Sequence, residues 1–150
     1  MSQSLRIALF PGSFDPFTVG HEALVRRALA LFDRVVIAVG QNSDKHYMFS
    51  AQERVEKARL FFANDERVQV VAYSDMTVDC CRRMGATFIL RGLRNAADLE
   101  YEMKVAAVNR ALAPEIETVT LLADVDMADV SSTLERERML HSASNNDNIC

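Results

Sequence analysis

Cysteine is scarce in this sequence, and long apolar runs are missing. Of the three cysteines among 150 residues, Cys80 and Cys81 are adjacent and Cys150 is terminal. None of these spacings is typical of a zinc site or a disulfide framework, so we expect free thiols and a reducing, cytoplasmic compartment. The first residues form no apolar signal segment, and no run of 18 apolar residues occurs. Neither secretion nor a membrane span is therefore expected.

An excess of basic residues is also missing. The chain has 17 Lys and Arg against 21 Asp and Glu, a formal net charge of −4. Proteins that bind duplex nucleic acid usually carry a basic excess, so no nucleic-acid partner is expected. The dinucleotide-binding GxGxxG fingerprint and the phosphate-binding GxxxxGK[ST] loop are both absent. No Ser/His/Asp or Cys/His set points to covalent catalysis.

Five short apolar runs alternate with stretches long enough for helices. The runs cover residues 5–10, 35–39, 68–72, 87–90 and 119–122. Nearly continuous apolar runs are typical of strands that helices cover on both faces, and the alternation predicts a parallel sheet. We expect an α/β fold, a Rossmann-like doubly wound five-stranded parallel sheet with helices on both faces. Ligands of such sheets bind beyond the carboxyl ends of the strands.

Several residues carry signals for helix ends. Ser50 and Glu53 form a capping-box pattern at the start of one helix. Asp75 is expected to cap a short helix that Gly85 ends, and Asn95 to cap the long helix that follows.

The end of the chain has its own pattern. Ser132 and Glu135 repeat the capping-box spacing. We expect residues 1–140 to form a single domain and the polar residues 141–150 to be a disordered tail.

The first apolar run leads into the segment PGSFDPFTVGH, residues 11–21. Gly12 permits close backbone approach, and Ser13 offers a hydroxyl and an N–H. His21 lies in the first turn of a helix, where free N–H groups and the helix dipole attract anions. Taken alone, this pattern is about as often an ordinary turn with a surface histidine.

Basic residues follow two other runs. Lys45 comes after the second run, where a loop lysine is usually only solvated. Arg91 and Arg94 flank a helix start after the fourth run and form an anion trap of forked donors. Their spacing also permits an ion pair of Arg94 with Asp98, which would leave Arg91 free for a ligand.

Hydroxyl side chains gather after the fifth run, in the segment MADVSSTLER, residues 127–136. Hydroxyls and free N–H groups at a helix start can bind phosphates. By itself the segment is an ordinary serine-rich cap.

Together and in this order, the segments resemble the phosphopantetheine adenylyltransferase family, within the nucleotidylyltransferases marked by an H/TxGH motif. The matching motifs are TVGH, NSDK, RGLR and VSSTLER, the last with Val130 in place of the isoleucine of ISSTxxR. The resemblance covers residues 7–138. It implies adenylyl transfer from ATP to 4′-phosphopantetheine, giving dephospho-coenzyme A and pyrophosphate in coenzyme A biosynthesis. It also implies a homohexamer. We expect Mg²⁺ to accompany the triphosphate, bound mainly by substrate oxygens, and no dedicated metal site in the protein.

The resemblance also implies roles for single residues. The catalytic set is His21, Lys45 and Arg91. Ser13, Lys45, Thr77 and Arg91 bind the pantetheine substrate. The residues that bind ATP are Ser13, Phe14, His21, Gly92, Leu93, Arg94, Glu102, Met127, Ala128, Asp129, Val130, Ser131, Ser132 and Thr133.

After Leu140 the chain departs from the family, which continues through a Gly-Asp turn and a final helix, whereas this chain ends in HSASNNDNIC. Two alternatives remain at this point. One is a small-molecule nucleotidylyltransferase that uses CTP or a nicotinamide mononucleotide acceptor. The other is a catalytically weak nucleotide-binding homologue.

Overall fold

The structure, a computed structural model, describes residues 4–124 and 127–147. In this part of the chain, strands and helices alternate as the sequence predicts. The elements are β1 (Ile7–Gly12), α1 (Val19–Ala28), β2 (Arg34–Gly40), α2 (Ala51–Phe61), β3 (Val68–Tyr73), α3 (Thr77–Met84), β4 (Phe88–Leu93), α4 (Ala96–Leu112), β5 (Glu117–Leu122) and α5 (Met127–Asp147). Over the described ranges, no helix is both long and apolar enough to cross a membrane.

The five strands form one parallel sheet in the order β3-β2-β1-β4-β5. The strand order reverses between β1 and β4. At this point β1 pairs along a shorter length with β4 than with β2. The β1–β2 ladder runs from Ile7↔Arg34 to Gly12↔Val39, whereas β1 and β4 pair only at Ala8↔Phe88 and Leu9↔Ile89. β1 and β4 therefore part toward their carboxyl ends, which is where sheets of this type bind ligands.

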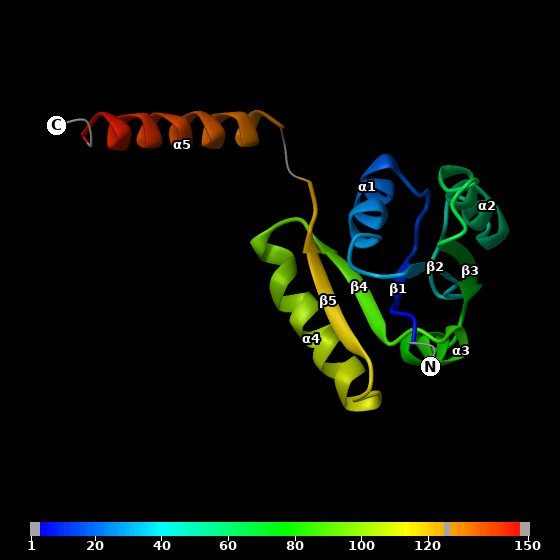
Figure 1. The fold of residues 1–150 in the computed structure, drawn as a ribbon. Coiled ribbons are helices and arrows are strands. Elements are labelled where there is room, and N and C mark those ends of the chain that lie inside the picture. Colours follow the sequence, from blue (N-terminus) through cyan, green and yellow to red (C-terminus); the bar gives the residue numbers. More distant parts are fainter. Residues whose placement is uncertain (1–3, 125–126, 148–150) are drawn as a thin grey trace.

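Helices cover both faces of the sheet, which confirms the doubly wound α/β fold (Figure 1). Successive strand residues point to opposite faces. Ala8 and Phe10 therefore pack with α1 and α2, and Leu9 packs with α3 and with Ala113 after α4. One hydrophobic core therefore lies on each face of the sheet, and the connecting loops lie at its carboxyl edge.

Three of the predicted helix ends are confirmed. Ser50 accepts a hydrogen bond from the Glu53 N–H, and the Glu53 side chain accepts one from the Ser50 N–H, which makes the capping box of α2. Asn95 caps α4 by accepting from the Asp98 N–H. Gly85 ends α3 with φ +72°.

The cap predicted for α3 is wrong. Met76 is the N-cap residue and makes no side-chain capping bond. The Asp75 carboxylate instead binds the guanidinium of Arg83, at 2.5 Å. A charged, two-pronged donor is a stronger partner for a carboxylate than one backbone N–H.

The last helix also differs from expectation. α5 begins at Met127, so Ser132 lies within the helix and not at its N-cap, and it continues to Asp147. Residues 141–147 are therefore helical, whereas a disordered tail was expected. No glycine or proline stands between 127 and 147 to end the helix, and Glu137 lies 3.7 Å from His141 one turn later. α5 extends away from the sheet (Figure 1).

Replacing Gly85 tests the conformation that ends α3. We expect Gly85→Ala to lower the free energy of unfolding by about 1 to 2 kcal/mol, because Ala in the left-handed region brings its Cβ against the following carbonyl. Gly85→Asn is the control, because Asn tolerates this conformation better. Urea unfolding measures both. Equal stability of the Ala variant and the wild type would contradict the prediction.

Candidate functional site

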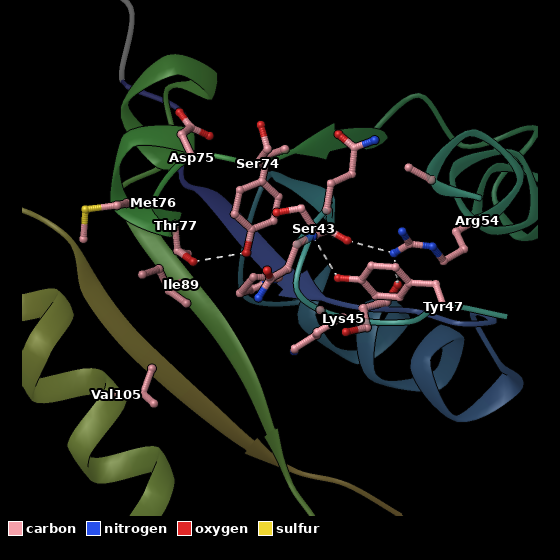
Figure 2. Close-up of a pocket in the computed structure, with 18 of the residues that line it drawn as sticks. Ser43, Lys45, Tyr47, Arg54, Ser74, Asp75, Met76, Thr77, Ile89 and Val105 are labelled. Carbon is pink, nitrogen blue, oxygen red and sulfur yellow. Dashed lines mark hydrogen bonds between the residues drawn. The ribbon is translucent and has the colours of Figure 1, made fainter. Parts of the chain in front are cut away.

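A groove of about 1220 Å³ opens at the carboxyl edge of the sheet, beside the gap between β1 and β4 (Figure 2). All four residues predicted to bind the pantetheine substrate line it: Ser13, Lys45, Thr77 and Arg91. They follow or end four different strands, so the parallel sheet brings them together. α4 supplies an apolar wall, which includes Val105.

The loop after β1 has a conformation that depends on its glycine. Phe14 lies in the left-handed region at φ 46° and is only 5% exposed. A Cβ on Gly12 would lie 2.8 Å from the Phe14 ring. Glycine is therefore required where the Phe14 ring folds back over the strand end. The ring then packs against Phe17 and His21 at centroid distances of 5.3 and 5.0 Å.

His21 is held by the residue that caps its own helix. Thr18 caps α1, and its backbone N–H donates to His21 Nδ1 at 3.0 Å. Nδ1 is thus an acceptor, and the proton of the neutral ring lies on Nε2. Burial, and secondarily the positive charge of Arg94, lower the pKa of His21. At neutral pH the imidazole is therefore uncharged and presents an Nε2–H donor.

Arg91 forms the principal ion pair of the groove. Its Nε and Nη2 donate to the two carboxylate oxygens of Glu102 at 2.8 and 2.7 Å, and its Nη1 donates to the Pro11 carbonyl at 3.2 Å. The bonds to Glu102 raise the pKa of Arg91. The bond to Pro11 reaches across the gap between β4 and β1. A bidentate pair fixes the plane of the guanidinium as well as its position.

This pairing corrects one expectation. Arg94 was expected to pair with Asp98 and leave Arg91 free, but Arg91 is the arginine paired with α4. Within residues 4–124 no ion pair joins Arg94 to Asp98. The Asp98 N–H is bound to the Asn95 cap, which places Asp98 in the first turn of α4, whereas Glu102 lies one turn further on, facing the end of β4.

Lys45 and Arg94 are the uncompensated cations among the predicted site residues. Neither the Lys45 ammonium nor the Arg94 guanidinium has a hydrogen-bond or ion-pair partner in the described part of the chain. Lys45 lines the groove from the loop that follows β2 (Figure 2). The charge of Arg94 lowers the pKa of His21, which lies in the first turn of α1; we call this part of the site the α1 side. Both charges are available to an anion.

Two groove residues were not predicted from the sequence. The Tyr73 hydroxyl, at the end of β3, lies 3.1 Å from the Thr77 hydroxyl, and burial raises the pKa of Tyr73. Arg54 of α2 is 1% exposed and lines the groove. The sequence signal for Arg54 is its spacing, because it stands one turn before Ala58 on the buried face of α2.

The remaining predicted residues are placed differently. Gly92 packs closely against α1, since a Cβ there would lie 3.0 Å from Leu24. Ser131, Ser132 and Thr133 are exposed on α5, which extends away from the carboxyl edge, so the structure does not bring them to the other site residues (Figure 1). α5 follows β5, which is the edge strand of the sheet beyond β4. The side chains of Met127, Ala128, Asp129 and Val130 lie outside the described residues.

Comparisons with known proteins show the family of this chain. The sequence model of the cytidylyltransferase-like family matches residues 9–138. A phosphopantetheine adenylyltransferase of Flavobacterium psychrophilum is 44% identical over 133 residues, which are 89% of this chain and 87% of the relative. One of Phocaeicola vulgatus is 47% identical over 133 residues, with the same shares.

A solved structure shows a similar fold. It is that of a lipopolysaccharide core biosynthesis protein from Thermoplasma volcanium, with a TM-score of 0.56 and 16% sequence identity. The match covers 81% of this chain and 98% of that one. At this identity the likeness concerns the fold alone.

The titration of His21 tests the electrostatics of the α1 side. We expect its NMR titration midpoint to lie below the ordinary value of 6.5. In Arg94→Gln the midpoint should rise, because a positive charge no longer opposes protonation, but it should stay below 6.5 because the ring remains buried. Arg110→Gln, which removes an exposed charge paired with Glu117, is the control. An unchanged midpoint in Arg94→Gln would contradict the assignment.

Proposed function

This chain belongs to the phosphopantetheine adenylyltransferase family of cytidylyltransferase-like proteins, and we propose that it transfers the adenylyl group of ATP to 4′-phosphopantetheine. The products are dephospho-coenzyme A and pyrophosphate, in coenzyme A biosynthesis. One observation carries the proposal: the four residues for which the family resemblance predicts a pantetheine-binding role come from four strand ends and line a single groove.

The chemistry is mainly electrostatic. The attacking phosphate monoester is already ionised, so it needs no strong general base, but it has to approach a triphosphate of the same sign. At an effective dielectric of about 20, two unit charges 4 Å apart repel by about 4 kcal/mol. Cations that hold both groups in line offset this repulsion and raise the rate by orientation.

The groove supports a role as the acceptor site. Lys45 and Arg91 would hold the nucleophilic phosphate, with Arg91 oriented by Glu102. Thr77 would bind the pantetheine arm, with its hydroxyl oriented by Tyr73. The apolar wall of α4 suits the aliphatic parts of that arm, because it buries carbon without leaving polar groups unpaired.

The α1 side supports a role as the ATP site. His21 would donate from Nε2 to the α-phosphate as charge develops there, and Arg94 adds a positive charge beside it. Ser13, Phe14, Gly92, Leu93 and Glu102 would complete this site. We also assign Met127, Ala128, Asp129, Val130, Ser131, Ser132 and Thr133 to the triphosphate, an assignment that needs the start of α5 to lie over the carboxyl edge.

Mg²⁺ would enter with the triphosphate. Residues 4–124 and 127–147 hold no cluster of three or more His, Cys, Asp or Glu fit to bind a metal ion. Mg²⁺ keeps much of its water and prefers phosphate oxygens, so the triphosphate would supply the principal ligands of the ion. The ion would in turn neutralise part of the triphosphate charge.

A homo-oligomer, a hexamer by family resemblance, is also proposed. α4 has no buried side chain, and two of its exposed large apolar residues, Leu99 and Met103, lie outside the groove lining. Copies of the chain that cover such a face would remove apolar surface from water. We further propose a cytoplasmic location, which the free thiols of Cys80 and Cys81 support.

Pyrophosphate release with ATP and 4′-phosphopantetheine tests the proposed function, and His21→Ala tests the role of the imidazole. We expect turnover by the wild type, and a fall in kcat of about 100-fold in the variant with little change in the KM for ATP, because the contact strengthens in the transition state. His46→Ala is the control. Activity with CTP or a nicotinamide mononucleotide acceptor instead would refute the function, and unchanged kcat would refute the role of His21.

Replacing Arg91 tests the acceptor site. Arg91→Met should raise the KM for 4′-phosphopantetheine about 10-fold or more, because a charge-assisted hydrogen bond to phosphate is lost. Arg110→Met is the control. Arg110 lies on α4, as Glu102 does, and its replacement breaks only an exposed ion pair with Glu117 of β5. Steady-state kinetics with each substrate varied in turn measures the effect. Normal affinity for the acceptor in Arg91→Met would contradict the assigned role.

A further inference from the structure

Arg54 of α2 is a buried cation at the floor of the groove and is only 1% exposed. Its Nη1 donates to the carbonyl oxygens of Ser13 and Gly40, both at 2.8 Å, and its Nε donates to that of Phe49 at 3.1 Å. The guanidinium also lies over the Tyr47 ring, 3.8 Å from the ring centroid (Figure 2). Through residues 4–124 and 127–147, no carboxylate forms an ion pair with it.

The three carbonyl groups belong to segments that surround Lys45. Gly40 ends β2 immediately before the loop that carries Lys45, and Phe49 closes that loop before α2. Ser13 belongs to the loop after β1. One guanidinium therefore holds both ends of the Lys45 loop against the β1 loop, so the distance between these two loops depends on Arg54.

Further bonds make the loop one unit with its neighbours. The Asp15 carboxylate, from the β1 loop, accepts hydrogen bonds from the N–H groups of Met48 and Phe49, at 2.5 and 2.9 Å. The Tyr47 hydroxyl accepts from the Asn42 N–H at 3.0 Å, across the turn that contains Lys45. Because the Asn42–Tyr47 bond ties the loop together and the Asp15 bonds tie its end to the β1 loop, a shift of the loop ends displaces the lysine as well.

The three carbonyl bonds do not fully offset the free-energy cost of burying the Arg54 charge. Burial of an ion without a counter-ion costs several kcal/mol, and carbonyl groups offset this only in part because each peptide unit is neutral overall. Arg54 therefore leaves a net positive charge beneath a groove that Lys45 and Arg91 also line. The charge of Arg91 is balanced by Glu102, whereas that of Arg54 has no such balance. An anionic ligand in the groove would supply the missing negative charge.

We propose that Arg54 is a positioning residue for the adenylyl acceptor. It sets the Lys45 loop against Ser13, and it adds a buried positive charge that the acceptor phosphate neutralises on binding. The inference rests on the proposed function, because it concerns affinity for 4′-phosphopantetheine at the same groove.

The test compares two arginines of α2. Arg54→Met should raise the KM for 4′-phosphopantetheine 10-fold or more and leave the KM for ATP within about threefold. Arg59→Met is the matched control, because Arg59 is an exposed arginine on the same helix that donates to one carbonyl, that of Val70, at 3.2 Å. It loses the same charge away from the groove, and we expect both KM values to stay within twofold.

A milder variant separates positioning from a general loss of structure. Arg54→Lys keeps the charge but cannot bind all three carbonyls. It should raise the KM for the acceptor severalfold in the wild-type background and less than twofold in a Lys45→Ala background, because the residue acts through Lys45. A structural role alone would give the same ratio in both backgrounds. The comparison of Arg54→Lys in these two backgrounds also tests the inference if Arg54→Met does not fold.

The outcomes that overturn the inference are distinct from those that overturn the function. A folded Arg54→Met enzyme with an unchanged KM for 4′-phosphopantetheine, equal rises in both KM values, or additive effects of Arg54→Lys and Lys45→Ala would each refute the role of Arg54 while wild-type turnover upholds the function. Absence of wild-type turnover with ATP and 4′-phosphopantetheine would refute both.

Discussion

The unequal pairing of β1 with its two neighbours is the constraint on which the rest of the site depends. β1 follows β2 along its whole length but pairs with β4 only at Ala8 and Leu9, so the sheet opens at its carboxyl edge. Arg91 spans the opening by its bond to the Pro11 carbonyl. Because the strands are parallel, all their carboxyl ends and the loops that follow them lie at this edge.

The charged groups at this edge are compensated to different degrees. Arg91 is balanced by Glu102, and His21 is kept neutral by its burial and by Arg94. Lys45 and Arg54 carry positive charges without carboxylate partners in the described part of the chain. A site of this kind prefers an anion over a neutral ligand, because the anion offsets charges that the protein leaves unbalanced. That preference suits a phosphate acceptor in a family that transfers adenylyl groups.

Much of the fold was predictable because its signals are local. Continuous apolar runs indicated the strands, and the Ser50 and Glu53 pair indicated the start of α2. The exceptions were equally local in origin. Asp75 is a residue type that often caps helices, but the guanidinium of Arg83, eight residues later in the last turn of α3, is the stronger partner. The polar composition of residues 141–147 predicts disorder, but α5 continues through them because the segment contains no glycine or proline to end the helix.

The sequence by itself determined the order of strands and helices, the loops that bear the site, and the family. Only the tertiary structure decided which partners these residues take. It paired Arg91 with Glu102, left the proton of His21 on Nε2, and bound Arg54 to three carbonyl groups with no carboxylate partner among the described residues. The physical reason is that strand and helix signals act between near neighbours in the chain, whereas hydrogen bonds across a sheet edge depend on where distant segments meet.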